Sequence, residues 1–229
     1  MSIRQNLETL RRQIDEVAVS CGRDPGEIGL LAVSKYHDIS SILEAYNAGH
    51  RDFAENYVQE LSGKIPSAPA DVNWHFIGPL QSNKLKDITG QVELIHCVST
   101  VKHLLKIDGI AREKGITQNI LFQLKTSHEE SKAGCSEEEL DDLFAALTDC
   151  SSVCCQGFMT MPPFFDDPEM SVPYFEKTSE VFRKYAAGNH PNFKPVHLSM
   201  GMTGDFAQAI RCGSTILRIG TAIFGERNY

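Results

Sequence analysis

The sequence predicts a (β/α)8 barrel in a single domain with an extra helix at its amino end, and three observations support that fold. The chain has 229 residues, a length that suits one barrel because single barrels run to about 250 residues. After the first helix, short apolar stretches alternate with amphipathic stretches of helical periodicity. Eight such strand–helix units can be counted. The alternative, an open doubly wound sheet, expects a glycine-rich turn after its first strand, whereas here that strand ends in Ser34-Lys-Tyr-His37.

The first element is a helix, because apolar residues recur at spacings of three and four from Ile3 to Val17. Cys21-Gly22 ends this helix, and Asp24-Pro25 follows as a turn. The eight strands are predicted at Ile28–Lys35, Asp52–Asn56, Val72–Gly78, Leu94–Ser99, Asn119–Lys125, Val153–Met161, Pro195–Gly201 and Thr215–Phe224.

The helices between the strands carry recognisable start and stop signals. Ser40 is expected to cap the first of them, an acidic first turn begins the one at Glu137, and a proline opens the one at Pro173. Glycines follow directly after several of these stretches. The helices are predicted at Ser40–Ala48, Tyr57–Lys64, Asn83–Ile88, Val101–Lys114, Glu137–Leu147, Pro173–Ala187 and Asp205–Cys212, with loops at Pro66–Asp71 and Pro162–Pro173.

The composition excludes several classes of protein. Twenty-two Lys and Arg stand against 30 Asp and Glu, a net charge of −8 with the basic residues scattered along the sequence, which argues against a nucleic-acid partner. The apolar stretches are too short to span a membrane, and no secretory signal opens the chain. The seven cysteines are odd in number and form no Cys-x-x-Cys, so we expect reduced thiols, no metal site and a cytoplasmic location.

Lys35 ends the first apolar strand and is the first candidate for chemistry. Active sites of barrels form at the carboxyl ends of the strands. An amine that is partly removed from water loses its proton more easily and becomes nucleophilic, which suits Schiff-base formation. A lysine whose ammonium reaches solvent is the simpler interpretation for this residue taken alone.

Two glycine-rich turns near the end of the chain, Leu198–Asp205 and Leu217–Gly225, could hold a phosphate. They fall after the seventh and eighth strands, where barrels often bind phosphate. Ser199, Thr203 and Thr221 offer hydroxyl groups, Gly201, Gly204 and Gly220 allow close backbone approach, and the helix starting at Asp205 offers its amino end. Ordinary tight turns are the alternative. Combined with Lys35, the two turns predict a site for pyridoxal 5'-phosphate (PLP).

Arg218 lies in the last strand, on the same side as Gly220. A guanidinium that faces a barrel interior needs a partner, since burying its charge alone is costly. The pyridine nitrogen of PLP is one candidate, and the carboxylate of Glu55, at the end of the second strand beside Asn56, is the other. An arginine partner would make PLP a weaker electron sink than a carboxylate partner would. His75 and His197 lie in predicted strands, where a histidine is more often a core residue than a site residue.

Several motifs together resemble the pyridoxal phosphate homeostasis protein family, whose members are small relatives of the alanine racemase N-terminal barrel. The motifs span nearly the whole chain: Leu30–Lys35, Phe53–Glu60, Trp74–Lys84, Ser131–Gly134, Leu198–Thr203 and Arg218–Gly225. This chain reads Lys35-Tyr-His-Asp38 where members often read Lys-Thr-Lys-Pro, and Thr203 replaces a serine.

The resemblance implies the barrel of PLP fold type III, with residues 1–229 as one PLP-binding domain. It also implies that Lys35 holds PLP as a Schiff base and that Ser199, Thr203, Gly220 and Thr221 hold the phosphate. Arg218 would face the pyridine nitrogen and Asn56 would lie beside the cofactor.

We therefore predict a cytoplasmic, monomeric PLP-binding protein that carries or buffers the cofactor, with PLP-dependent apoenzymes as candidate recipients. Racemases of this type add a tyrosine base from a second domain, and we expect that domain to be missing because the chain ends at Tyr229. Tyr36, Tyr57 and Tyr174 are the local candidates for such a base. A PLP-dependent amino-acid racemase that uses one base and water is the alternative function, and a cofactor-free Schiff-base aldolase is a third.

Overall fold

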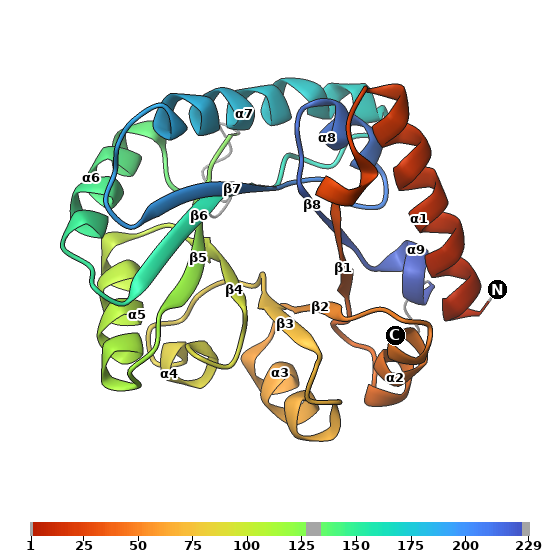
Figure 1. Ribbon diagram of the computed structural model, residues 1–229, viewed down its shortest axis with the longest axis horizontal. Coiled ribbons are helices and arrows are strands. Elements are labelled where there is room, and N and C mark those ends of the chain that lie inside the picture. The colour runs from red at the N-terminus through yellow and green to blue at the C-terminus, as the bar shows by residue number, and fades with distance from the viewer. Residues whose placement is uncertain (1, 127–133, 226–229) are drawn as a thin grey trace.

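A computed structural model describes residues 2–126 and 134–225 of the chain. Eight parallel strands close into a barrel in the order β1 to β8, and β8 pairs with β1 to complete the ring (Figure 1). The helices lie around the outside of this ring (Figure 1). The predicted (β/α)8 barrel with an additional amino-terminal helix is thereby confirmed, while Ser131 to Ala133 and Tyr229 lie outside the described residues.

Six of the eight strands are shorter than the sequence predicted, whereas β5 and β7 keep their predicted length but lie one and two residues earlier in the chain. Their bounds are β1 Gly29–Val33, β2 Asp52–Glu55, β3 Asn73–Phe76, β4 Leu94–Val98, β5 Gln118–Leu124, β6 Val153–Thr160, β7 Phe193–Ser199 and β8 Ile216–Ile219. The α-helices are α1 Ile3–Ser20, α2 Ile39–Asn47, α3 Val58–Lys64, α4 Leu85–Ile88, α5 Val101–Glu113, α6 Glu137–Thr148, α7 Val172–Ala186, α8 Phe206–Arg211 and α9 Thr221–Phe224. Short 3-10 helices lie at Pro25–Glu27, Ile65–Ser67 and Pro168–Ser171.

Two predicted elements were wrong in a way that bears on the site. The last strand was expected to reach Phe224, but it ends at Ile219, and Thr221–Phe224 is a turn of helix that begins after Gly220. Apolar residues continue through both parts, so hydrophobicity alone does not mark the break. The cap of α2 is Asp38 and not Ser40, because the Asp38 carboxylate accepts the Ser41 backbone N–H at 3.1 Å.

The additional helix α1 packs on the outside of the barrel. Ser2 and Gln5 form a capping box at its start, and the buried residues Leu7, Leu10, Ile14 and Ala18 face the fold. The helix packs against α2, α8 and α9. It therefore joins the first helix of the barrel to the last two, which follow the strands β7 and β8.

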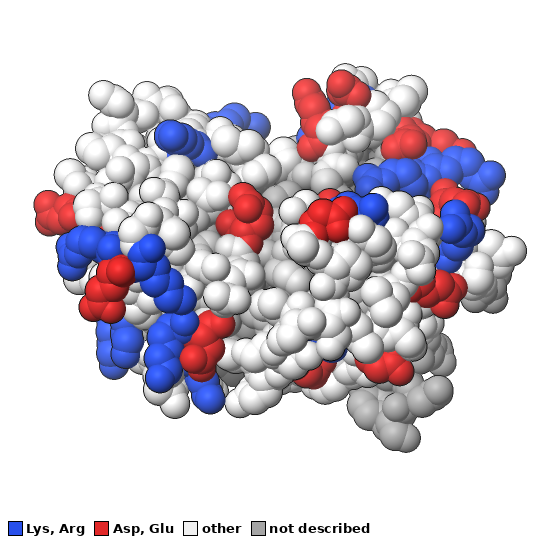
Figure 2. All heavy atoms as spheres, turned by 60° about the horizontal axis from the view of Figure 1, so that its bottom comes forward, with Lys and Arg blue, Asp and Glu red and all other residues white. Residues whose placement is uncertain are grey.

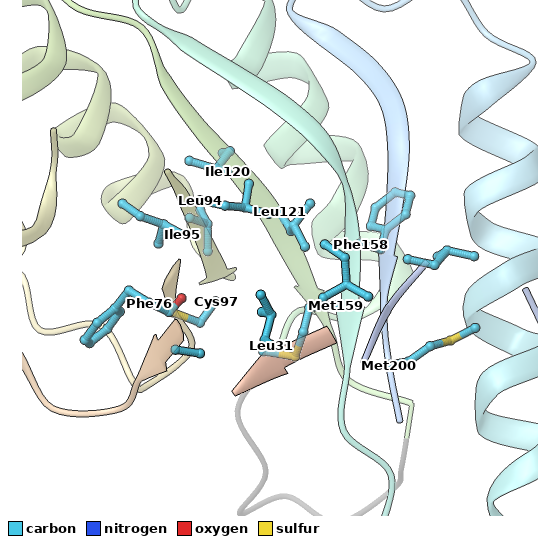
Figure 3. Close-up of a cluster of buried hydrophobic side chains, with 14 of the residues drawn as sticks. Leu31, Phe76, Leu94, Ile95, Cys97, Ile120, Leu121, Phe158, Met159 and Met200 are labelled. Carbon is cyan, nitrogen blue, oxygen red and sulfur yellow. The ribbon is translucent and has the colours of Figure 1, made fainter. Parts of the chain in front are cut away.

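The buried core runs through the barrel and out to the surrounding helices. Figure 3 shows part of it, with Leu31 of β1, Leu121 of β5 and Met159 of β6 among the buried side chains. Parallel strands that are covered on both faces read as nearly continuous apolar runs, which is why the strands could be found in the sequence.

Basic side chains gather on one part of the surface, although they are scattered along the sequence. Figure 2 shows Lys and Arg over the side of the molecule formed by α4 and α5, where the exposed residues are Lys86, Lys102, Lys106, Arg112 and Lys114. Acidic residues, Glu113 among them, lie between these basic ones in the sequence. Among the helices of the described residues, none has the length and apolar character needed to cross a lipid bilayer.

Candidate functional site

The carboxyl ends of the strands surround one cavity of about 490 Å³. Six of the seven predicted site residues line it: Lys35, Asn56, Thr203, Arg218, Gly220 and Thr221. They come from the ends of β1, β2 and β8 and from the turn after β7, so residues at opposite ends of the sequence meet in one place. The seventh, Ser199, is fully buried and lies outside the lining.

Lys35 sits in a tight turn directly after β1. The turn is closed by a hydrogen bond from the His37 N–H to the Ser34 carbonyl oxygen, at 3.1 Å. Tyr36 has a φ of 67°, the left-handed conformation that side chains other than glycine rarely adopt. Its N–H donates to Glu60 Oε2 at 2.8 Å, and its hydroxyl shares a hydrogen bond with that of Tyr57. Contacts from the next βα unit therefore hold the backbone that carries Lys35.

A second lysine, Lys64 of α3, holds the same turn in place through hydrogen bonds. Its Nζ donates to the Ser34 carbonyl oxygen at 2.9 Å, to Glu55 Oε1 at 2.7 Å and to Glu60 Oε2 at 2.9 Å. Glu55 is fully buried and also accepts the Ser34 hydroxyl at 2.6 Å. Burial raises the pKa of Glu55 above its usual value, while the hydrogen bond from Lys64 acts to lower it. Glu55 is thus the partner of Lys64, and the idea that it pairs with Arg218 was wrong.

Arg218 lines the floor of the cavity and has only 5 % of its surface exposed. Its Nη1 donates to Ser199 Oγ at 2.8 Å and its Nη2 to the Thr160 carbonyl oxygen at 2.9 Å. Burial lowers the pKa of Arg218 to about 10, partly offset by the charge of Asp205, so the guanidinium keeps its proton at neutral pH. No carboxylate of the described residues forms an ion pair with it.

The cavity therefore holds a buried positive charge, which is stabilised by an electron-rich partner. Asn56, on another side of the cavity, has a buried amide oxygen without a hydrogen-bond partner. Buried polar atoms are normally satisfied, so a ligand group is a reasonable partner for this amide, which can turn to present either its oxygen or its nitrogen. Lys35, Arg218 and Asn56 together fit a small polar molecule with a carbonyl carbon and a ring nitrogen, as PLP has.

The two predicted phosphate turns both reach the cavity, but their helices differ from expectation. The helix after β7 begins at Phe206 rather than at Asp205 and has six residues. Asp205 is buried, and its carboxylate accepts the Met202 N–H at 2.6 Å, which organises the turn that carries Thr203. After β8, the helix α9 presents its amino end at Thr221. The first N–H groups of a helix have no acceptor within the helix, so this end offers donors to an anion.

The loop after β6 forms an apolar side of the cavity. The predicted loop Pro162–Pro173 contributes Pro163, Phe164 and Phe165 to the lining, and the ring of Phe164 is 86 % exposed. His37 also lines the cavity and stacks on Phe224, with the ring centroids 4.7 Å apart. Of the three residues that depart from the family pattern after Lys35, His37 lines the cavity, and Tyr36 and Asp38 are not among the lining residues.

Sequence reasoning missed His96 and Lys64 as residues around the site, and it placed Asp205 at the start of a helix and not in the turn before it. His96 lies in β4 between apolar residues and is fully buried, with its Nδ1 2.9 Å from Ser199 Oγ and its Nε2 3.1 Å from His75 Nδ1. A polar residue in the middle of an otherwise apolar strand was the available signal. His75 is a buried histidine as expected, and His197 is partly buried.

The buried histidines predict that the protein loses stability in mild acid. Burial lowers the pKa of His75 from 6.5 to about 4 and lowers that of His96 well below its usual value. The folded chain then binds these protons more weakly than the unfolded chain, so stability falls as the pH drops from 6.5 to about 4. His75 alone contributes about 3 kcal/mol over that range. The raised pKa values of Glu55 and Asp205 act in the opposite direction and offset part of the loss.

Urea unfolding at a series of pH values measures this loss. A His75→Asn variant serves as the comparison, because it lacks the titrating imidazole and should show a flatter dependence on pH over the same range. Equal pH dependence in the two proteins would contradict a lowered pKa of His75 in the folded chain.

The fold and the site define the class of this protein. Residues 3–228 match the family described as "Alanine racemase, N-terminal domain". Over the full length the chain is 38% identical to the "Pyridoxal phosphate homeostasis protein" of Haemophilus influenzae, covering 100% of this chain and 98% of the relative. It is 39% identical to the protein of that name from Escherichia coli K12, covering 99% and 97%. This chain therefore belongs to the pyridoxal phosphate homeostasis protein family.

Solved structures agree with this placement. PipY of Synechococcus elongatus, solved with PLP bound, is 31% identical and superposes with a TM-score of 0.85, over 98% of this chain and 100% of that one. Alanine racemase from Streptomyces coelicolor is 16% identical with a TM-score of 0.70, and the match covers 98% of this chain but 58% of the racemase. The second likeness concerns the barrel fold alone.

Proposed function

We propose that this chain binds PLP in the cavity at the carboxyl ends of its strands and serves in PLP homeostasis as a carrier or buffer of the cofactor. The observation that carries the proposal is the meeting of Lys35, the unpaired charge of Arg218 and the unsatisfied amide of Asn56 in one cavity. The names of the full-length relatives and the PLP in PipY support it.

Each residue has a role that follows from its chemistry. Lys35 Nζ is the covalent attachment point. Arg218 donates to the pyridine nitrogen and, because it keeps its own proton, leaves that nitrogen unprotonated. When bound, PLP supplies an aldehyde carbon that accepts an amine and a ring that withdraws electrons.

The anionic tail of the cofactor belongs at the other end of the cavity. Thr203, Gly220 and Thr221 line the cavity, and Thr221 is the first residue of α9, so their hydroxyl groups and backbone N–H groups would hold the phosphate. Asn56 lies beside the ring. The whole chain of 229 residues acts as one PLP-binding domain in this proposal.

The carrier role is favoured over racemisation by the placement of the tyrosines. Tyr36 and Tyr57 bond to each other through their hydroxyl groups, and neither of them nor Tyr174 is among the residues that line the cavity. A racemase of this type needs a second base across from the lysine. We further propose that the protein is a monomer and that PLP-dependent apoenzymes receive the cofactor.

Borohydride reduction followed by peptide mass analysis tests the attachment. Protein purified with PLP and reduced without any added substrate should carry a pyridoxyl phosphate group on Lys35 and on no other lysine. An adduct elsewhere, or none, would contradict the proposal. Covalent trapping that required a phosphorylated sugar and no PLP would favour the cofactor-free aldolase.

Deuterium exchange separates the carrier from the racemase. The PLP-loaded protein is incubated with L-alanine or L-serine in deuterated water, and the α-hydrogen is followed by NMR. We expect exchange far slower than enzymatic turnover, which is typically about 1–1,000 s⁻¹. Exchange at such rates would establish the racemase.

A further inference from the structure

Four buried side chains form a continuous hydrogen-bonded row across the interior of the barrel. Arg218 Nη1 lies 2.8 Å from Ser199 Oγ, Ser199 Oγ lies 2.9 Å from His96 Nδ1, and His96 Nε2 lies 3.1 Å from His75 Nδ1. The four residues come from β8, β7, β4 and β3. Each has less than a tenth of its surface exposed. The row begins at the cavity, which Arg218 lines, and ends at His75, which is not among the lining residues.

The direction of each hydrogen bond follows from the chemistry of the donors. A guanidinium can only donate, so Ser199 Oγ accepts from Arg218. Among the described residues, the other hydrogen-bond partner of that oxygen is His96 Nδ1, and a buried hydroxyl proton needs an acceptor. His96 Nδ1 therefore accepts from Ser199 and carries no proton. A neutral imidazole then has its proton on Nε2, which donates to Nδ1 of His75.

We propose that His96 and His75 are positioning residues for Arg218, and that Ser199 is the link through which they act rather than a direct ligand of the phosphate. Ser199 uses its single proton in the bond to His96, so it has none to give to an anion in the cavity. Its oxygen instead holds one end of the guanidinium while the Thr160 carbonyl oxygen holds the other at 2.9 Å. The plane of the guanidinium is thereby fixed before a ligand arrives, which reduces the ordering cost of binding.

The electrostatics of the barrel interior agree with this assignment. Burial lowers the pKa of both imidazoles, and the neighbouring charge of Arg218 lowers that of His96 further. Neutral histidines next to a buried arginine avoid a cluster of like charges, and a neutral His96 can accept from a hydroxyl. The proposal rests on the proposed function only in that the ligand Arg218 meets is taken to be PLP.

Nitrogen NMR of the protein without PLP tests the row directly. At neutral pH we expect His96 and His75 each to be neutral, with Nδ1 unprotonated and Nε2 protonated. A proton on Nδ1 of His96, or a positive charge on either ring, would overturn the proposal. This measurement needs no bound cofactor, so it decides the row even if the chain failed to bind PLP and the proposed function were lost.

Two substitutions of His96 separate positioning from mere packing. In His96→Asn the amide oxygen takes the place of Nδ1 and can still accept from Ser199, whereas His96→Gln places its amide near Nε2 and loses that acceptor. We expect PLP affinity, measured by absorbance titration, to fall about five- to tenfold in the glutamine variant and to change less than twofold in the asparagine variant. His197→Asn, two residues before Ser199 and outside the row, is the control with unchanged affinity. Equal losses in the asparagine and glutamine variants would count against the proposal.

The role of Ser199 is tested in a background without the guanidinium. Ser199→Ala should weaken PLP binding in the native chain but add nothing to Arg218→Lys, because a residue that acts through Arg218 loses its effect with it. A further loss of affinity in the double variant would show that Ser199 binds the phosphate directly and would overturn its role as a link. Urea unfolding of all variants identifies any that bind weakly because they are not folded.

Discussion

Replacing Lys35 by alanine is expected to abolish covalent PLP binding completely and leave the barrel folded. The lysine is half-buried and lines the cavity, and it is the attachment point in the proposed site. The native protein should be yellow when loaded with PLP, and the variant should show neither that visible absorbance nor a borohydride-stable adduct. Binding through Arg218 and the phosphate turns remains, so dialysis should remove PLP from the variant and not from the native chain.

A second half-buried lysine provides the matched control for this experiment. Lys125 follows β5 directly, as Lys35 follows β1 closely, but it does not line the cavity. Lys125→Ala should keep the colour and the adduct. Loss of colour in both variants would indicate a general effect on the fold, and an adduct retained in Lys35→Ala would place the attachment on another lysine.

Gly78→Ala is expected to disturb the fold strongly, because the backbone of the neighbouring strand end leaves no room for a side chain. A Cβ at this position would lie 1.9 Å from the Asn56 carbonyl oxygen and 2.5 Å from its carbonyl carbon. Both are backbone atoms, so β2 and β3 would have to separate at their carboxyl ends. We expect a loss of about 3 kcal/mol or more in the free energy of unfolding, and weaker PLP binding because Asn56 is displaced.

Urea unfolding measures the effect, and a glycine in open space provides the comparison. Gly109 lies inside α5, and a Cβ there would meet nothing within 4 Å. Gly109→Ala should therefore stabilise the chain by about 0.5–1 kcal/mol, since alanine favours a helix. A Gly78→Ala protein as stable as the native chain would show that the two strand ends can separate freely.

Much of the barrel could be predicted because its signals are local. Strands that are buried on both faces give apolar runs, and amphipathic helices give a repeat close to four residues, so the alternation of eight units is visible without knowing any contact. The ends of elements were less certain because apolar residues continue across them. Thr221–Phe224, predicted as strand, is helical because the chain turns at Gly220, where an added Cβ would lie 3.0 Å from the Val33 carbonyl oxygen.

The candidate site was predicted in part from residue chemistry and in part from the family resemblance. Lys35 could be found because a charged residue at the end of an apolar strand is unusual, and the glycine-rich turns lie where barrels bind phosphate. The partners of Arg218 could not be found in this way. Ser199 and Thr160 are 19 and 58 residues from it, and no local pattern records which groups meet across a barrel.

The sequence by itself determined that this chain forms a barrel and that Lys35 stands at the carboxyl end of its first strand, because periodicity and strand direction are properties of consecutive residues. Only the tertiary structure decided that Glu55 pairs with Lys64, that Arg218 has no carboxylate partner among the described residues, and that Ser199, His96 and His75 lie in one row with it. The physical reason is that closing the ring sets the distances between distant strands, and those distances determine which buried charges and hydrogen-bonding groups satisfy one another.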